Sequence, residues 1–177
     1  MSNSFTLTNI SQLVTNNSAI GDGDLGVITN AAITVTDGIV SWVGQANDAD
    51  SSVQQTDVGG RSLIPGFVDS HSHLMFAGDR SAEFAARMAG VPYSAGGIKV
   101  TTDATRNASD DQLRTVARGL IKEMHESGTT TIEIKSGYGL DVATEERSVR
   151  IAAELTDEVT FLGAHVVAPE FSANSDA

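Results

Sequence analysis

Two histidines separated by one residue are the clearest chemical signal in this sequence. The segment Asp69-Ser70-His71-Ser72-His73 directly follows the apolar run Leu63 to Val68, which we interpret as a buried strand. Side chains alternate along an extended chain, so His71 and His73 point to the same face. Two neutral imidazoles on one face can hold a divalent metal such as Zn or Fe, which activates water for hydrolysis. Because such a pair also arises by chance, two surface or hydrogen-bonded histidines are the alternative.

Further candidate residues follow two later apolar runs. His165 comes shortly after Val159 to Leu162, at a predicted strand end, where a site role and a purely structural role are equally plausible. Tyr138 lies in the Gly-flanked turn Ser136 to Gly139, shortly after the β-branched run Thr129 to Ile134. This turn offers a phenol and main-chain donors. Its spacing differs from that of a phosphate-binding loop, so a nucleotide site is not indicated.

Two cations near these segments each have two interpretations. The guanidinium of Arg80 suits bidentate recognition of a substrate carboxylate, whereas an ion pair with Asp79 or Glu83 would be structural. Both interpretations of Arg80 remain open. Lys135 would bridge two metal ions if it were carboxylated, but we favour an ordinary ion pair with Glu133.

The distribution of charge separates two regions of the 177-residue chain. Its formal net charge is −12, and residues 1–60 contain six Asp but no Glu, Lys or Arg. Short β-branched runs recur in this region, and Asp37-Gly38 between two of them predicts a two-residue hairpin. We therefore predict a small all-β, β-sandwich-like unit over residues 1–60, with a polar surface loop from Gln45 to Gln55.

Residues 61–177 alternate between predicted strands and helices. Strands are expected at 63–68, 129–134 and 159–162, and helices at 82–89, from Ser109, and from Asp141 or Thr144 to near Leu155. Ser109 and Gln112 have the spacing of a capping box, and Gly128 suits the helix end. His125 on this helix is interpreted as solvent-exposed. The order of elements predicts a parallel α/β layer with crossover helices.

Composition excludes several classes of protein. The absence of cysteine rules out a disulfide scaffold and thiolate metal ligands. No apolar run approaches the roughly 18 residues that span a bilayer, and the first residues lack the pattern of a signal peptide. The acidic balance argues against nucleic acid or an anionic membrane as partner. We expect a soluble, cytoplasmic protein.

Several motifs, in order, resemble one family. The stretch Leu63 to Leu74 is similar to the opening strand of the amidohydrolase superfamily. Narrower similarity to the imidazolonepropionase family lies in Gly78-Asp79-Arg80 with Glu83-Phe84, Glu133 to Leu140, Phe161 to His165, and Pro169-Glu170-Phe171. The resemblance implies that residues 61–177 form the first three or so β/α units of a truncated (β/α)8 TIM-type barrel, which alone needs about 250 residues.

The resemblance also implies an activity and its site. A member of this family opens the cyclic amide of 4-imidazolone-5-propanoate to N-formimidoyl-L-glutamate in histidine degradation, using one Zn or Fe ion and a metal-activated water. His71 and His73 match two metal ligands, and Arg80, Tyr138 and His165 match positions that contact substrate. His165 is also the catalytic candidate, as an oxyanion donor or by orienting the ring. The family's remaining metal ligands lie on strands after residue 177.

These implications define the expected partners and the rival hypotheses. The expected partner is a small-molecule substrate with a carboxylate tail, and a homodimer is compatible with the sequence. The closest rival is another metal-dependent amidohydrolase, such as a deaminase or a cyclic-amide hydrolase, whose substrate would give Arg80 no carboxylate to bind. A third hypothesis is that the 177-residue chain alone is inactive, because two ligands do not complete a catalytic metal site.

Overall fold

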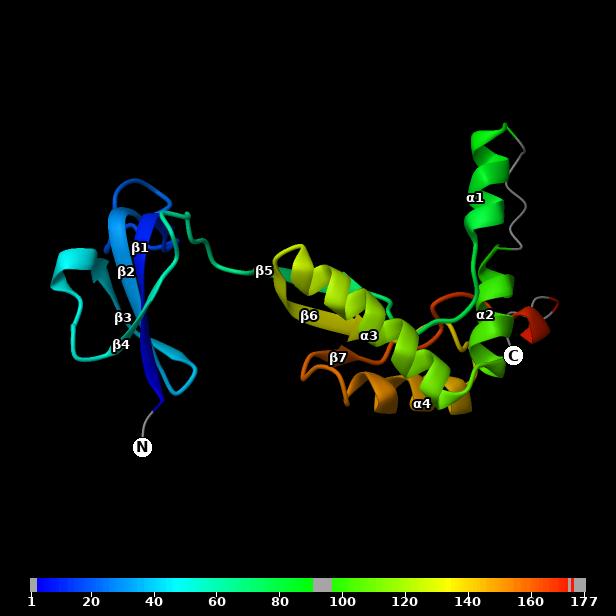
Figure 1. Ribbon diagram of the computed structural model, residues 1–177. Helices are drawn as coiled ribbons and strands as arrows, with labels where there is room; N and C mark the ends of the chain where they lie inside the picture. Colours follow the sequence, from blue (N-terminus) through cyan, green and yellow to red (C-terminus); the bar gives the residue numbers. More distant parts are fainter. Residues whose placement is uncertain (1–2, 91–96, 172, 174–177) are drawn as a thin grey trace. The chain divides into compact units, whose positions relative to one another are not determined.

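The chain divides into two compact units, Met1–Pro65 and Gly66–Ala177. The computed structural model describes residues 3–90, 97–171 and 173 (Figure 1). The first unit is a sheet with its own apolar core, and the second combines a sheet with helices. Within the described residues, no helix combines the length and the apolar character needed to cross a bilayer.

The first unit is a four-stranded sheet in the order β3-β2-β1-β4. Its strands are β1 (Ser4–Val14), β2 (Val27–Thr36), β3 (Ile39–Gln45) and β4 (Gln54–Asp57), with a short 3-10 helix at Ala46–Asp48. The first three strands pair antiparallel and β4 pairs parallel with β1. Asp37 and Gly38 join β2 to β3 with φ of 51° and 82°, so both lie in the left-handed region, and the predicted hairpin is confirmed.

Two predictions for this unit concern a surface loop and a second sheet. The expected surface loop from Gln45 to Gln55 is wrong at its end, because Gln54 and Gln55 pair with β1 as part of β4. Every residue of β4 is exposed and polar, so no hydrophobic alternation marks the strand in the sequence. The described residues form one sheet here, and a second sheet that would make a sandwich is not seen among them.

The second unit has a parallel three-stranded sheet in the order β5-β6-β7. Its strands are β5 (Phe67–Ser72), β6 (Thr129–Lys135) and β7 (Val159–Thr160), and its helices are α1 (Ser81–Met88), α2 (Gly97–Asn107), α3 (Asp110–Glu126) and α4 (Val142–Ala152). A 3-10 helix follows at Pro169–Phe171. Helices connect β5 to β6 and β6 to β7, which is the predicted parallel α/β order.

The helix α3 begins and ends as its sequence predicts. The Ser109 hydroxyl accepts from Gln112 N at 3.2 Å and the Gln112 side chain accepts from Ser109 N at 2.8 Å, which completes the capping box. Gly128, with φ of 93°, follows the last turn. One face of α3 buries Leu113 and Ala117 completely, in a core shared with Ile132, Ile134 and Ile151.

The first strand of this sheet differs from its prediction. The expected strand Leu63 to Val68 is divided: Leu63 forms a bridge with Leu13 in the first unit, whereas β5 starts at Phe67. Pro65-Gly66 separates the two parts, because proline cannot donate to a strand ladder and glycine is a poor strand residue. The consequence is that β5 includes His71 and ends one residue before His73.

Candidate active site

Four of the predicted site residues lie together in the second unit. The ring centroids of His71 and His73 are 5.3 Å apart, and those of His73 and His165 are 4.9 Å apart. Tyr138 lies 5.5 Å from His73 and 6.0 Å from His165. We call His71, His73, Tyr138 and His165 the ring cluster. Residues far apart in the chain thus meet in one place.

The parallel sheet explains why these residues meet. His71 and His73 lie at the end of β5, Tyr138 follows β6, and His165 follows β7. The carboxyl ends of adjacent parallel strands lie along one edge of a sheet, and in α/β folds this edge carries the site. The alternation that places His71 and His73 on one face follows from their spacing along the extended chain.

His73 has the properties of a metal ligand. Its imidazole is partly buried, and its Nδ1 is buried without a hydrogen-bond partner among the described residues. Burial lowers the pKa of His73 below its usual range, and the nearby His165 and His71 lower the pKa further. A neutral imidazole with a free ring nitrogen is the form that coordinates Zn or Fe.

The described residues supply only part of a metal site. They contain no group of three or more His, Asp or Glu side chains placed to hold a metal ion. His71 is exposed beside His73, so the pair offers two nitrogen donors on one face. This donor set fits the predicted role, while metal binding by His71 and His73 stays a prediction.

The turn that carries Tyr138 is fixed by Glu145, which the sequence reasoning missed. The Glu145 carboxylate accepts hydrogen bonds from Gly137 N at 2.7 Å, Gly139 N at 2.7 Å and Leu140 N at 2.8 Å. Glu145 is only 4% exposed, in the first turn of α4. Three main-chain donors at the turn that was expected to offer them to a ligand are therefore engaged by Glu145 within the protein. The ring of Tyr138 takes no part in these bonds and lies beside His73 and His165.

Arg106 of α2 holds the other side of the same turn and was also missed. Its guanidinium donates to Gly139 O at 2.7 Å and pairs with Asp141 at 2.9 Å. It also pairs with Glu170 at 2.9 Å. Arg106 thereby joins the turn after β6 to the segment that follows His165. No local sequence pattern marks Arg106, since its partners are 33 to 64 positions away.

The two cations with competing interpretations are both in ion pairs. Arg80 donates to both carboxylate oxygens of Glu83, at 3.0 and 2.7 Å, next to α1. The ring contacts above do not involve Arg80, and its substrate role stays a prediction. Lys135 forms the favoured pair with Glu133, and Thr160 donates to the same carboxylate. His125 is exposed in the last turn of α3, as expected.

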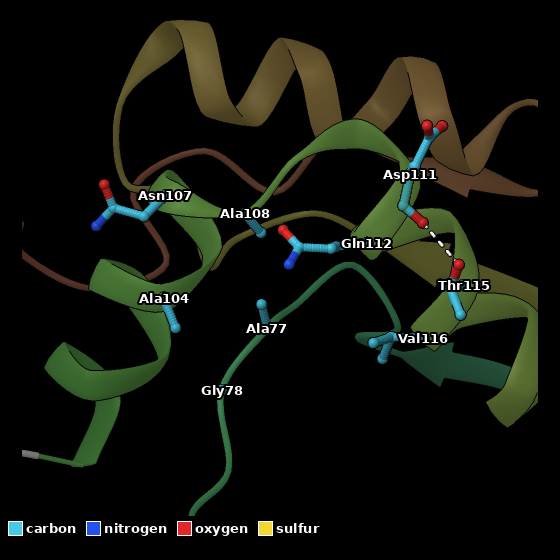
Figure 2. Close-up of a pocket in the computed structure, with 9 residues that line it drawn as sticks. All are labelled: Ala77, Gly78, Ala104, Asn107, Ala108, Asp111, Gln112, Thr115 and Val116. Carbon is cyan, nitrogen blue, oxygen red and sulfur yellow. Dashed lines mark hydrogen bonds between the residues drawn. The ribbon is translucent and has the colours of Figure 1, made fainter.

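A cavity in the described part of the chain lies away from the ring cluster. It has a volume of about 570 Å³ and lies between the segment after β5, α2 and α3. Figure 2 shows Ala77 and Gly78 opposite Ala104 of α2, with Val116 on the α3 side. Its lining contains one charged residue, Asp111, and none of the ring cluster. We therefore assign the candidate site by its converging side chains and not by cavity size.

The chain is similar over nearly its whole length to curated bacterial enzymes. It is 54% identical over 175 residues to the imidazolonepropionase of Rhodococcus jostii, which covers 99% of this chain and 43% of that protein. It is 55% identical over 173 residues to the imidazolonepropionase of Salinispora tropica, covering 98% of this chain and 44% of that protein. The chain thus spans less than half the length of these relatives. No protein-family model matches it.

The fold is also similar to solved hydrolase structures. The atrazine chlorohydrolase of Arthrobacter aurescens, solved as a complex with zinc, aligns with a TM-score of 0.56 over 90% of this chain and 35% of that one. The two sequences are 20% identical, so the likeness concerns the fold. The mixed α/β class predicted from the sequence is confirmed.

Proposed function

Because this chain corresponds to the amino-terminal part of imidazolonepropionases at about 54% identity, we propose that it forms part of such an enzyme. The reaction is hydrolysis of 4-imidazolone-5-propanoate, in which water adds to the ring carbonyl and the ring C–N bond opens to give N-formimidoyl-L-glutamate. The observation that carries the proposal is the ring cluster. It brings His71, His73, Tyr138 and His165, each matched to the family by its motif, to one edge of the sheet.

His71 and His73 would hold the divalent metal, Zn or Fe. When bound, such an ion polarises a carbonyl and lowers the pKa of water. His73 contributes a ring that burial keeps neutral, and its unpartnered Nδ1 supports the assignment. Further ligands are needed to complete the site, because the described residues place no group of three or more His, Asp or Glu side chains together.

His165 and Tyr138 would contact the substrate. His165 packs against His73, so its imidazole can orient the ring of the substrate or donate a hydrogen bond to oxygen as negative charge develops there. The Tyr138 ring lies beside both histidines and presents its phenol from a fixed turn. Each donor to a charged oxygen contributes on the order of 1.5–3 kcal/mol.

Arg80 would bind the propanoate tail. Its fork already makes a two-bond contact with the carboxylate of Glu83, which shows the geometry that a substrate carboxylate requires. Binding through Arg80 would then exchange one carboxylate for another, or add to it.

The finer description of the fold belongs to the same proposal. The parallel order β5-β6-β7, with helices between consecutive strands, supports the start of a (β/α)8 barrel in residues 61–177. The sheet of residues 1–60 would be one layer of a β-sandwich-like unit. A cytoplasmic location and a homodimer stay predictions.

A hybrid enzyme tests the proposed function. This chain would replace the matching part of the Rhodococcus jostii imidazolonepropionase, and hydrolysis of 4-imidazolone-5-propanoate would be followed by loss of substrate absorbance. We expect turnover and bound metal, and loss of both on replacing His71 and His73 with Ala. A folded, metal-loaded hybrid that acts only on substrates without a carboxylate, such as aminated bases, would favour the rival deaminase.

Variants of Arg80 test the tail contact in the same hybrid. Replacing Arg80 with Ala should raise KM for the carboxylate substrate. Arg87→Ala removes the same charge from the last turn of α1, which Arg80 precedes, and serves as the matched control. Unchanged kinetics in Arg80→Ala would remove the tail contact from the proposal and leave the rest intact.

A further inference from the structure

The acceptor of the three main-chain hydrogen bonds after β6 is a buried carboxylate. One oxygen of Glu145 accepts from Gly139 N and Leu140 N, and the other accepts from Gly137 N. Hydrogen bonds to an ionised acceptor are stronger than neutral ones. Glu145 therefore accepts from three of the five main-chain N–H groups of Ser136 to Leu140, at 2.7 to 2.8 Å.

Capping of its own helix does not explain why Glu145 is buried and bonded to the turn. The N-cap of α4 is Asp141, whose side chain accepts from Thr144 N at 2.8 Å and from the Thr144 hydroxyl at 2.8 Å. The bonds of Glu145 instead run backwards to residues five, six and eight positions earlier. An acidic residue in a first turn needs only its charge to favour the helix dipole, and that charge does not require burial.

The turn that Glu145 holds has no spare room next to the ring cluster. A Cβ at Gly137 would come within 3.3 Å of His165 Cβ, 3.4 Å of His165 Cγ and 3.5 Å of His73 Cε1. Tyr138, the next residue, is in ring contact with the same two histidines. A small displacement of this turn would therefore change the separation of His73, His165 and Tyr138 together.

We propose that Glu145 is a positioning residue, which sets the turn from Ser136 to Leu140 so that Tyr138 and Gly137 lie against His73 and His165. Glu145 acts through the main chain, since the hydrogen bonds that its carboxylate accepts come from Gly137, Gly139 and Leu140 N. The inference rests on the proposed function only in taking the ring cluster as the active site.

The test compares Glu145→Gln with Glu146→Gln in the 177-residue chain, by NMR. The two residues are adjacent, but Glu146 is exposed, so the control removes the same charge without touching the turn. A glutamine amide keeps one acceptor oxygen and sets an N–H donor against a main-chain N–H. In Glu145→Gln, hydrogen exchange at Gly137 or at Gly139 and Leu140 should therefore speed up by about tenfold or more.

The imidazole C–H signals report the consequence for the site. In Glu145→Gln, the signals of His73 and His165 should move towards the position of the exposed His125, whose own signal should stay unchanged. Glu146→Gln should move none of them. Glu145→Asp keeps the charge but is one carbon shorter, so positioning predicts shifted signals there too, whereas a purely electrostatic role predicts the wild-type spectrum.

Two results would overturn the proposal. One is a folded Glu145→Gln chain in which the signals of His73 and His165 do not move. The other is measured on the wild-type chain and is available even if both variants fail to fold. In it, the amides of Gly137 and Gly139 lose protection from hydrogen exchange on warming below the unfolding transition, while the imidazole signals of His73 and His165 do not change. None of these measurements requires turnover, so a failure of the hydrolysis assay would overturn the proposed function alone.

Discussion

Replacing Gly137 with Ala is the most demanding prediction for the candidate site. Gly137 has φ of 127°, a region that residues with a side chain rarely adopt. Holding alanine there costs about 1–3 kcal/mol, against which the stiffer unfolded chain returns about 0.4–1 kcal/mol. The new methyl group would also press on His165 at 3.3 Å. We therefore expect a net loss of about 2 kcal/mol in the unfolding free energy of the second unit.

The chain contains a control for the same substitution. Gly119 lies in the interior of α3, and a Cβ there meets no atom within 4 Å. Gly119→Ala should raise the unfolding free energy by about 0.5–1 kcal/mol, because alanine is the better helix residue. The same chemical change is thus expected to have opposite signs at Gly137 and Gly119.

Urea unfolding followed by helical circular dichroism measures both effects. The α-helices of the described chain all lie in the second unit, whereas the one tryptophan, Trp42, lies on β3 and reports on the first unit through its fluorescence. With a slope of about 2 kcal/mol per molar urea, Gly137→Ala should lower the circular dichroism midpoint by about 1 M. An unchanged or raised midpoint, together with unmoved imidazole signals of His73 and His165, would refute the close approach at Gly137.

Three further predictions concern the elements that support the site. Ser109→Ala removes half of the capping box of α3 and should cost about 1 kcal/mol of unfolding free energy, measured by urea titration; no loss would mean that the cap is not formed in solution. Leu113→Ala empties a fully buried position and should cost about 2–5 kcal/mol, and a loss below about 1 kcal/mol would contradict its place in the core. Burial alone would raise the pKa of Asp141, but hydrogen bonds from Thr144 and the charge of Arg106 outweigh it and leave the pKa below its usual range. The stability that the Asp141 charge contributes is therefore present above about pH 4 and lost as the pH falls through the lowered pKa, so Asp141→Asn, which keeps a capping side chain, should flatten the acid limb of stability against pH.

Local signals in the sequence were sufficient for the elements whose ends are marked by their own side chains. The Ser109 capping box and the Asp37-Gly38 hairpin each involve residues within a few positions, and both form as predicted. Of the two predicted starts of the later helix, Asp141 and Thr144, Asp141 is the N-cap. These interactions depend on spacing alone, because the partners belong to the same turn of chain.

The helix α2 is an element that local sequence signals do not predict. The sequence analysis predicts no helix at Gly97–Asn107. The buried face of this helix carries three β-branched threonines. Thr101, Thr102 and Thr105 are 4% exposed or less, so polar residues occupy the buried side. The Thr105 hydroxyl donates to Thr101 O and accepts from Ala77 N, whereas the buried Thr102 hydroxyl has no hydrogen-bond partner among the described residues. A pattern search for apolar periodicity cannot find a helix that buries threonine.

The candidate site likewise contains residues that sequence patterns predict and a residue that they do not. The order of strands was enough to predict that His71, His73 and His165 lie at strand ends, because parallel strands align their carboxyl ends. Glu145 was not found, since in the sequence it is one more acid near a helix start. Its role depends on a turn that folds back over it, and only the three-dimensional arrangement reveals that contact.

The parallel sheet of the second unit has a further consequence, for the behaviour of the chain at high concentration. In the described sheet, β5 and β7 are the outer strands, each bonded to β6 on one side. Phe67 and Val68 of β5 are 57% and 67% exposed, so an apolar surface accompanies that outer edge. An exposed strand edge with apolar side chains is a template for a strand from another molecule. Self-association by edge pairing, and not loss of the fold, should then limit how far this chain can be concentrated.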